Sequence, residues 1–491
     1  MDRLCYDTLR KTGYNGYLLQ DAPERVLQFG DGKFLRAFSE HFVDIMNEKA
    51  GFDSKVVVCQ ARGNDRDNVL NEQEGLYTLV LRGLSGGKKE EMTRVISCIS
   101  RCINPARDFD ALLEKAGNPD LRFIVSNTSE AGIAFDADCR PDDCPPKSFP
   151  GKLTRFLYER YKKNLPGFII LSCELIDRNG DVLLDCVEKY IKLWDLPEGF
   201  LNWVRSENRF CSTLVDRIVS GCTKDEAASL CEKFGYEDEL IDVGEIYGLW
   251  VIEADESIKK EFPVDKCDVP ILITDNVDAY KKRKVRMLNG AHTSMIMAAY
   301  LAGHDTVGSC MEDPVIRDFM RRTLRDEIIP VLNDFDESDL SGFADAIEDR
   351  FANPFIHHEL LSIALNSTAK WKARVMPTVL EYHEQTGKLP SRLSFSFAAY
   401  LSFYHRGRKL TEEGLEAKRG DDIYLIKDDR NVLEAFYGLK DATLDVLADK
   451  IISNEDMWGD GLRDLPGFTE KVIRYLELIE DKGIYEVAKT L

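Results

Sequence analysis

The sequence predicts an α/β protein of two domains, in which an N-terminal doubly wound parallel sheet (1–277) precedes a mostly α-helical domain (278–491). Three observations support this. The 491 residues exceed the ~250–300 at which a single hydrophobic core stops growing. Short apolar runs alternate with helical patterns in the first half, which indicates parallel strand pairing. Long helical patterns dominate after residue 278.

The first domain begins with a strand at residues 24–30, followed by a helix over 34–48. A second strand is expected at 55–60, a third at 121–127 and a fourth at 168–174, with a helix at 152–163 before the fourth. Residues 76–83 and 93–100 also have strand character. We interpret these two as an inserted, antiparallel extension of the sheet.

The second domain should start just after the last strand-like run, residues 269–274. We therefore place the domain boundary within residues 274–278. The helical patterns that follow cover residues 278–302, 314–333, 358–386, 392–406, 430–452 and 468–490.

Composition excludes several classes of partner. Hydrophobic residues make up 44% and charged residues 31%, as in ordinary globular proteins. The formal net charge of −21 argues against a nucleic-acid or anionic-membrane partner, because both require a basic face. It does not argue against a small anionic substrate, which needs only a few local cations.

The chain shows no sign of export. Its first residues lack the apolar segment of a signal peptide, and no apolar run approaches the ~20 residues of a membrane span. The 13 cysteines are an odd number without a disulfide-like framework, which is typical of reduced thiols. We therefore expect a cytoplasmic protein, whose oligomeric state the sequence leaves open.

A glycine-containing turn follows the first strand. Gly30 and Gly32 stand where the phosphate loop of a Rossmann-like domain belongs, and such glycines let backbone N–H groups approach a pyrophosphate. The third glycine of the usual motif is replaced by Leu35, so a plain strand-to-helix turn is the alternative. On the cofactor interpretation, the binding residues here are Phe29, Gly30, Gly32 and Phe34.

The ends of the second and third strands supply further cofactor candidates. Gln60 ends the second strand, where NAD-binding proteins often carry an acid, and Arg62 nearby suits a 2′-phosphate. The residues alone therefore leave NAD and NADP open. Asn127, Thr128 and Glu130 follow the third strand and are candidates for the nicotinamide side; their alternative role is to cap the next helix.

The strongest chemical pattern is Lys284, Asn289 and His292. On an ideal helix Asn289 lies about 140° and His292 about 80° from Lys284, so the three share one broad face. A buried lysine suits proton transfer, and an amide N–H can polarise a carbonyl. The alternatives are a solvated basic run over 281–284, a helix irregularity at Asn289 and a core histidine.

Five stretches together resemble the mannitol dehydrogenase family, the polyol-specific long-chain dehydrogenases. The lysine motif resembles that family's K-x-x-x-x-N-x-x-H, and residues 30–37 resemble its G-x-G-x-F-x-R-A. Residues 214–220 resemble V-D-R-I-x-[PS], residues 172–180 resemble S-C-[DE]-x-x-x-x-N-G, and residues 366–377 resemble a substrate-side helix. The order is kept over nearly the whole chain.

The resemblance implies a metal-independent, NAD-dependent oxidoreductase acting on a CH–OH group. Lys284 would be the general acid and base, Asn289 and Asn179 would hold the oxyanion, and His292 would orient the substrate. No metal is expected, because neither close cysteine pair, Cys98 with Cys102 or Cys139 with Cys144, has the spacing most typical of zinc.

Details within the family favour a branch that acts on a small sugar acid. The stretch at 173–180 reads C-E-L-I-D-R-N-G, so Leu175 replaces an asparagine found in other branches, and Lys281 replaces a glutamate. Lys370 and Arg374, at i and i+4, are our candidates for the substrate carboxylate, together with Arg36. A solvated basic face is the alternative for the pair at 370 and 374.

Two other functions stay open at this point. One is a sibling enzyme of the same family with a different keto sugar acid or polyol as its substrate. The other is a non-catalytic nucleotide-sensing protein, although such a protein would be expected to have lost the lysine or the asparagine.

Overall fold

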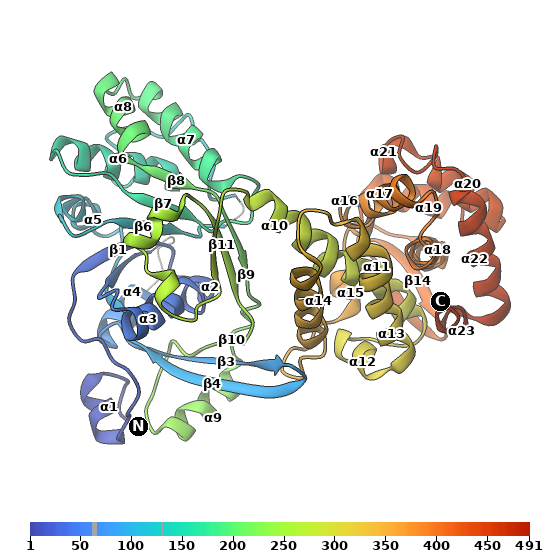
Figure 1. The fold of residues 1–491 in the computed structure, drawn as a ribbon, viewed down its shortest axis with the longest axis horizontal. Coiled ribbons are helices and arrows are strands. Elements are labelled where there is room, and N and C mark those ends of the chain that lie inside the picture. Colours follow the sequence, from blue (N-terminus) through green and yellow to red (C-terminus); the bar gives the residue numbers. More distant parts are fainter. Residues whose placement is uncertain (61–65, 130) are drawn as a thin grey trace. The chain divides into compact units, whose positions relative to one another are not determined.

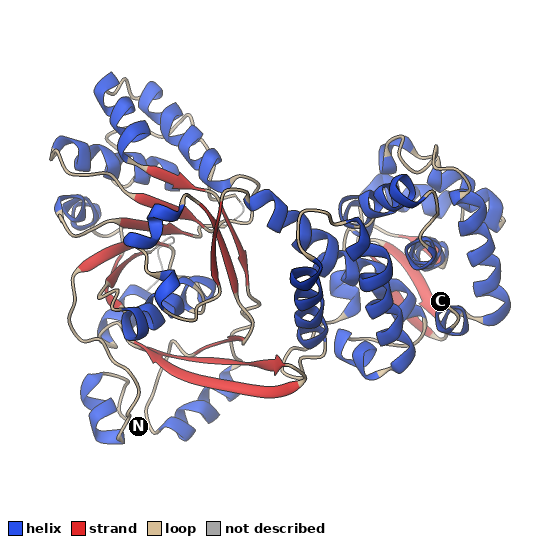
Figure 2. Ribbon diagram, in the orientation of Figure 1, coloured by secondary structure: helices blue, strands red, loops and turns tan. Residues whose placement is uncertain are grey.

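The computed structural model describes residues 1–60, 66–129 and 131–491, and the chain divides into two compact units. Unit 1 holds Met1–Arg82 and Glu90–Tyr280, and unit 2 holds Gly83–Lys89 and Lys281–Leu491. Figure 2 shows that unit 1 mixes strands and helices, whereas helices make up most of unit 2. The predicted fold class, a doubly wound domain with a mostly helical one, is confirmed.

Unit 1 is built on a six-stranded sheet in which every pair of neighbours is parallel. Its strand order is β5-β2-β1-β6-β7-β8. Successive strands are therefore added on one side of β1 first and on its other side afterwards, which places the switch point between β1 and β6. Ligands of open α/β sheets bind at such a switch point, outside the carboxyl ends of the strands. The strands are β1 (Glu24–Phe29), β2 (Lys55–Cys59), β5 (Ile99–Ile103), β6 (Phe123–Ser126), β7 (Ile169–Ser172) and β8 (Arg209–Cys211).

Both faces of this sheet are buried, which explains why its central strands carry apolar side chains on both faces. Val26 belongs to the core under α3 (Ser39–Ala50), whereas Leu27, the next residue, belongs to the core under α6 (Phe149–Lys162) and α7 (Asn179–Leu193). Figure 1 shows α3 on one side of the sheet and α6 and α7 on the other.

The helix predicted over residues 34–48 is two helices. A short α2 (Lys33–Arg36) is capped by Ala37, and Phe38 has φ −128° and ψ −87°, outside the helical region, before α3 begins. Phe38 itself is fully buried and stacks on Phe34 with 4.9 Å between ring centroids. The break therefore turns an apolar ring into the core and changes the helix direction just after the glycines.

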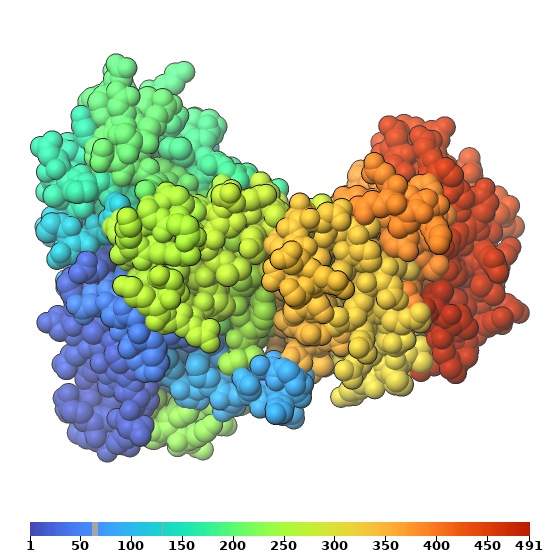
Figure 3. Space-filling model, viewed as in Figure 1, coloured from blue at the N-terminus to red at the C-terminus, as the bar shows by residue number. Residues whose placement is uncertain are grey.

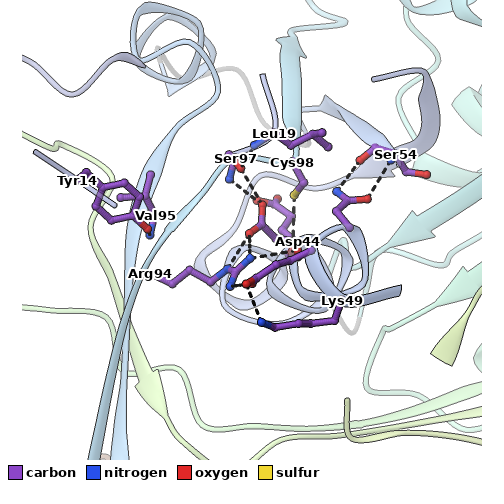
Figure 4. Close-up of polar contacts among 12 residues, drawn as sticks. Tyr14, Leu19, Asp44, Lys49, Ser54, Arg94, Val95, Ser97 and Cys98 are labelled. Atoms are coloured by element: carbon purple, nitrogen blue, oxygen red, sulfur yellow. Dashed lines mark hydrogen bonds and ion pairs between the residues drawn. The ribbon is translucent and has the colours of Figure 1, made fainter. Parts of the chain in front are cut away.

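The single strand predicted over residues 93–100 was wrong. β4 (Lys88–Ile96) ends before Ser97, and β5 begins at Ile99 in a different sheet. The reason is a buried acid on α3: the backbone N–H and the hydroxyl of Ser97 both donate to Asp44 Oδ1, at 2.9 and 3.1 Å (Figure 4). Side-chain capture of this kind competes with ladder hydrogen bonds.

Two three-stranded sheets complete unit 1. The first has the order β10-β3-β4 and the second β12-β11-β9. The strands β3 and β4 are neighbours joined by only Gly86 and Gly87, a connection that requires the antiparallel pairing predicted for this insertion. The insertion does not extend the six-stranded sheet, however, because β3 pairs on its other side with β10, in parallel. The strands are β3 (Tyr77–Ser85), β9 (Thr213–Asp216), β10 (Asp242–Glu245), β11 (Leu249–Glu253) and β12 (Ile271–Thr274).

The segment between β11 and β12 covers the α3 side of unit 1. It carries two 3₁₀ turns, Glu256–Lys260 and Val264–Lys266, and buries Ile258 and Phe262 against the core. Figure 3 shows it in yellow-green on the surface. The other helices of this unit are α1 (Tyr6–Thr12), α4 (Arg66–Glu72), α5 (Phe109–Glu114), α8 (Glu198–Glu207) and α9 (Lys224–Phe234).

Unit 2 is helical around the apolar helix α18 (Ser391–His405), which packs on α11 and α22. α10 (Val277–Lys284) leads from unit 1 into it. Its other helices are α11 (Gly290–Leu301), α12 (Val307–Glu312), α13 (Pro314–Arg322), α14 (Glu337–Phe351), α15 (Leu360–Ile363), α16 (Ser367–Arg374), α17 (Met376–Thr386), α19 (Arg430–Gly438), α20 (Leu444–Ile452), α21 (Glu455–Trp458), α22 (Phe468–Lys482) and α23 (Ile484–Lys489).

Several predicted long helices are interrupted. The stretch 358–386 is three helices, because Asn366 has a left-handed φ of 52° and Pro377 stands in the first turn of α17. The stretch 468–490 divides at Gly483, whose φ is 85°. An antiparallel sheet that the sequence reading missed joins α18 to α19, with strands β13 (Gly407–Leu410), β14 (Leu415–Arg419) and β15 (Asp422–Ile426).

Candidate active site

The turn after β1, residues 30–32, is referred to here as the glycine loop. Gly30 has φ 120°, and a β-carbon there would lie 2.7 Å from the carbonyl oxygen of Asn127, so only glycine fits. Gly32 differs, since it has an ordinary φ of −71° and no atom within 4 Å of where its β-carbon would be. Packing does not require glycine at this second position, but its bare backbone leaves room for a ligand to approach.

A pocket of ≈ 520 Å³ opens in unit 1, close to the carboxyl ends of β1, β6 and β7. It is lined by Phe34, Asn127, Ser129, Ala131, Leu175 and Val215. Ser129 has φ 110°, a conformation that costs a non-glycine residue free energy and is often found at binding sites. Leu175 is 63% exposed and presents an apolar side chain to the pocket.

The buried carboxylate of Glu174 fixes the segment after β6. It accepts hydrogen bonds from the Ser126 hydroxyl at 3.0 Å and from the backbone N–H and hydroxyl of Thr128 at 3.0 and 3.1 Å. Asn127 donates from Nδ2 to the carbonyl of Cys173 at 2.7 Å. Burial raises the pKa of Glu174 above its usual range, although these donors oppose the shift. No motif in the sequence marks this role of Glu174, although its position just after a strand could have suggested it.

The other predicted cofactor residues divide into three groups. Gln60 is buried at the end of β2, where its backbone N–H donates to the carbonyl of Ile103 at 2.9 Å. The ring of Phe29 belongs to the core and packs on Phe149, so only its backbone belongs to the site. Arg62 and Glu130 lie outside the described residues.

Asn179 is not the second oxyanion donor that we expected. Its Nδ2 donates to the carbonyls of Glu174 and Thr213, both at 3.0 Å, while its Oδ1 accepts from the N–H groups of Gly180 and Thr213. Only 1% of it is exposed. Both amide protons are therefore used to join the start of α7 to β9, which leaves none for a substrate.

Arg36 does not have the predicted substrate role either. Its guanidinium is 3% exposed, donates to the carbonyl of Leu240 at 2.6 Å and forms an ion pair with Asp242 at 3.6 Å. The arginine of the loop motif is thus a buried tie between α2 and the β10 side of unit 1.

In unit 2 the predicted proton-transfer residues lie along one continuous helical path. Lys284 is the last residue of α10, Asn289 is the last residue of a π-helical segment, Val285–Asn289, and His292 lies in the first turn of α11. Lys284 and Asn289 are both half-buried. π-helical segments are rare and are frequent at functional sites.

The π-helical segment corrects the predicted angles. The 100° step of an ideal α-helix does not hold between Lys284 and Asn289, because a π-helix forms i→i+5 hydrogen bonds and has more residues per turn. Residues five apart therefore come closer to one face than the predicted 140° implies. The Asn289–Gly290 pair was the sequence signal of this irregularity.

His292 is held by aromatic contacts. Its ring stacks on Phe351 at 3.9 Å between centroids and meets His358 edge-on at 5.3 Å. Its Nε2 is buried and has no hydrogen-bond partner among the residues that the structure describes. Burial, followed by the positive charges of His358 and two arginines, lowers the pKa of His292 well below its ordinary value. His292 is thus a neutral imidazole whose Nε2 hydrogen-bonding capacity is unused.

Arg374 contacts Thr293 and Gly290, two close neighbours of His292 in the chain. Its guanidinium donates to the hydroxyl of Thr293 at 3.4 Å, and a β-carbon on Gly290 would lie 3.3 Å from its carbonyl oxygen. Lys370, one turn earlier on α16, donates to the carbonyl of Ile363 at 2.8 Å. The two predicted substrate residues therefore share α16, and the C-terminal end of that helix packs against the start of α11.

Arg350, Lys370 and Arg374 form what we name the cationic cluster, and the imidazoles of His292 and His358, whose pKa values burial lowers, lie among them. Burial lowers the pKa of Lys370, as does the nearby charge of Arg374, and burial lowers the pKa of Arg374 itself. Asp428 opposes the effect on Lys370. In a chain with a net charge of −21, a half-buried group of like charges suits an anionic ligand.

The basic run before the motif is only partly solvated. Arg283 is 8% exposed, with its guanidinium over the rings of Phe335 and Phe343, and Arg286 donates to Thr378 and Glu381, both at 2.8 Å. These arginines attach the helical path of Lys284 to α14 and α17.

Across the described ranges, no three histidine, cysteine or acidic side chains come together as a metal site. No helix within those ranges is long and apolar enough to cross a membrane.

Two family models match the chain in order. The mannitol dehydrogenase Rossmann domain matches residues 24–266, and the mannitol dehydrogenase C-terminal domain matches residues 276–480. Among curated proteins, an altronate oxidoreductase of Yersinia enterocolitica is 41% identical over 488 residues, which covers 97% of this chain and 98% of the relative. That of Klebsiella pneumoniae is 41% identical over 480 residues, covering 96% and 97%.

Solved structures agree on the fold. A D-sorbitol dehydrogenase in substrate-free form superposes with a TM-score of 0.82 at 22% identity, covering 98% of this chain and 99% of that one. A mannitol 2-dehydrogenase of Pseudomonas fluorescens, in complex with NAD and D-mannitol, has a TM-score of 0.68 at 23% identity and covers 99% of both chains. Both family models and the near-full-length relatives lead to one conclusion: the chain belongs to the mannitol dehydrogenase family.

Proposed function

We propose that the chain is an NAD-dependent oxidoreductase that interconverts D-altronate and D-tagaturonate, without a metal. The cationic cluster in unit 2 is the observation that supports a sugar-acid substrate, because a sugar acid differs from a neutral polyol by its carboxylate. Arginine recognises a carboxylate through paired N–H donors, and Arg374 stands beside the neutral His292. The relatives named altronate oxidoreductases, alike over nearly the whole chain, support the same substrate.

The residues of unit 1 fit a nicotinamide dinucleotide. The glycine loop has an open backbone at Gly32, and the pocket beside Phe34 and Asn127 has the mixed apolar and amide lining that a nicotinamide ring needs. Bound there, the cofactor would supply or accept the hydride at the substrate carbon. Glu174 holds Thr128, and thereby the pocket wall, in place.

We propose NAD rather than NADP. The matched N-terminal domain is of the Rossmann type, and one neighbour in fold holds NAD. The ribose-side residue of this chain, Gln60, is buried and uncharged. Gln60 itself offers no cation for a 2′-phosphate, and Arg62, the candidate for that role, lies outside the described residues.

In the reaction, Lys284 gives a proton to the oxygen that becomes a hydroxyl during reduction, and takes it back during oxidation. Asn289 donates a hydrogen bond to the same oxygen while negative charge develops there. His292 directs Nε2 at a neighbouring hydroxyl of the substrate. Lys370 and Arg374 bind the carboxylate and so set which sugar enters.

Alternative functions predict different results. A fructuronate reductase or a mannitol-type polyol dehydrogenase would use the same proton-transfer residues but prefer another ketone. A non-catalytic nucleotide-sensing protein would bind the dinucleotide without turnover. A zinc-dependent sugar alcohol dehydrogenase would lose activity with a chelator and regain it with zinc.

The direct test is oxidation of D-altronate by the purified chain with NAD⁺, after treatment with a chelator. NADH should form, and ¹³C NMR of the product should match D-tagaturonate. Binding of NADH without any turnover on a sugar acid or polyol would contradict the proposal and support the nucleotide sensor.

A further inference from the structure

The buried end of β1 carries a glutamine whose hydrogen bonds reach the glycine loop. Gln28 is 1% exposed, and its Nε2 donates to the carbonyl of Gly30 at 2.9 Å and to Glu40 Oε1 at 2.6 Å. Its Oε1 accepts from the hydroxyl of Ser39 at 3.0 Å. The amide has one satisfied orientation, because a flip would turn its oxygen toward two acceptors.

This glutamine fixes the direction of one peptide group in the loop. In a planar trans peptide the C=O of Gly30 and the N–H of Asp31 point in opposite directions. Since Gln28 holds the carbonyl on its own, buried side, the N–H is turned to the other side of the loop. Phosphate-binding loops depend on backbone N–H groups that all face the ligand.

Glu40 connects both ends of the segment from Gly30 to Arg36. One of its oxygens accepts from Gln28, and the other, Oε2, lies 2.6 Å from the hydroxyl oxygen of Tyr77. That hydroxyl also lies 2.7 Å from the carbonyl oxygen of Arg36, the last residue of α2. A single buried acid therefore supports the start and the end of the phosphate-binding segment.

The protonation state of Glu40 decides whether Tyr77 can form both of its hydrogen bonds. Tyr77 has one hydroxyl proton but two acceptors in reach, and burial raises its pKa so that it keeps that proton. Both contacts are made together when Glu40 is protonated, because Glu40 then donates to Tyr77 and Tyr77 donates to the carbonyl of Arg36. Once Glu40 is ionised, Tyr77 turns its proton to the carboxylate and the Arg36 carbonyl loses its donor.

Glu40 changes charge near neutral pH. Burial raises its pKa to about 7, against the opposing effects of Tyr77, Gln28 and Arg36. Asp242, from β10, acts in the same direction as burial. The thiol of Cys98 also faces this residue, and donates to its backbone carbonyl at 3.4 Å.

We propose that Gln28 and Glu40 are positioning residues for the dinucleotide phosphates, which hold the glycine loop in its binding conformation from the buried side. This inference rests on the proposed function, since the loop is assigned there to the cofactor. Protonated Glu40 favours the binding conformation, so affinity for NADH is highest below neutral pH and weakens as pH rises above it.

The test is the Kd of NADH, measured by fluorescence titration on the full chain at pH 6 and at pH 8.5. Gln28→Met has the same length but no donor, so its Kd and its KM for NADH should rise about tenfold or more. The kcat at saturating NADH and the KM for D-tagaturonate should stay within about twofold of wild type, because the Lys284 motif and the cationic cluster are untouched.

A second variant tests the proton. In Glu40→Gln the new amide accepts from Gln28 and donates to Tyr77, which copies the protonated acid. It should bind NADH at pH 6 like wild type and keep that affinity at pH 8.5, where wild type has weakened. A wild-type pH slope in Glu40→Gln would overturn the role given to Glu40.

Asp44→Asn is the matched control. Asp44 is another buried acid on α3, one turn after Glu40, but it bonds to Ser97 and Arg94 and not to the glycine loop (Figure 4). This variant should lose thermal stability with an unchanged Kd for NADH. Folded Gln28→Met with wild-type affinity would overturn the inference alone, whereas a wild-type protein that binds no NADH would overturn the proposed function and the inference together.

Discussion

The imidazole of His292 lies flat against the ring of Phe351, with 3.9 Å between the ring centroids and 9° between the planes. The stack fixes the plane in which both imidazole nitrogens lie, and His358 closes one edge of the ring at 85°. A hydrogen bond to Nε2 must therefore come in that one plane. Phe351 and His358, which do not themselves react, thus restrict the positions from which a substrate hydroxyl can bond to Nε2.

Replacing Lys284 should separate chemistry from cofactor binding. Lys284→Ala should lower kcat by about 10²–10⁴-fold, the usual contribution of a positioned proton-transfer group. The Kd of NADH should not change, because the glycine loop and its pocket belong to unit 1. Steady-state kinetics and fluorescence titration measure the two values, and full turnover in this variant would refute the proton-transfer role.

Arg374 should control the preference for an acid sugar. In Arg374→Met the lost charge-assisted hydrogen bonds should raise the KM for D-tagaturonate by about 10–100-fold. The rate with neutral D-fructose should change little, so the ratio of kcat/KM values is the measurement. Arg374→Lys keeps the charge and should recover part of the loss; an equal loss on both ketones would show a structural role instead.

The two glycines of the loop should fail in different ways. Gly30→Ala puts a β-carbon 2.7 Å from a carbonyl oxygen at φ 120°, so it should lower the free energy of unfolding by about 1–3 kcal/mol and weaken NADH binding. Gly32→Ala meets no atom within 4 Å and should keep its Tm. Weaker NADH binding with an unchanged Tm in Gly32→Ala would locate the cofactor at this loop, and unchanged binding would argue against it.

His292 should make the protein less stable in acid. Its folded pKa lies below the ordinary 6.5, so the unfolded state binds more protons as pH falls below about 6.5, and stability decreases, by at most about 1.4 kcal/mol per pH unit. The Tm of His292→Gln should therefore fall less than that of wild type between pH 6.5 and 5. His357→Gln, at the exposed histidine that precedes His358 in the chain, is the control and should follow wild type.

The sequence predicted those parts of the fold that a local pattern of residues determines. The strands β1, β2, β6 and β7 carry apolar residues on both faces because both faces of the sheet are buried. Gly30 was predicted from its place in the turn after the first strand, and its φ of 120°, with a carbonyl oxygen 2.7 Å from the β-carbon position, is the reason that glycine stands there.

The predictions were wrong where a contact with a distant part of the chain determines the role of a residue. Asn179 was predicted to be a free hydrogen-bond donor. Its side-chain amide instead joins α7 to β9 through Thr213, 34 residues further along the chain. Arg36 matches a family motif, but its partner at Asp242 belongs to a distant strand. The π-helical segment after Lys284 is invisible to a fixed 100° periodicity. Gln28 and Glu40 show no motif at all, and only their contacts with Gly30 and Tyr77 reveal them.

The central claim is that this member of the family acts on a keto sugar acid with NADH. The most direct measurement is kcat/KM for D-tagaturonate, D-fructuronate and D-fructose in parallel, with NADH and again with NADPH. We expect D-tagaturonate with NADH to give the highest kcat/KM by at least about tenfold. A higher value with D-fructose would contradict the carboxylate role of the cationic cluster while leaving the Lys284 chemistry intact, and a higher value with NADPH would contradict the proposed cofactor.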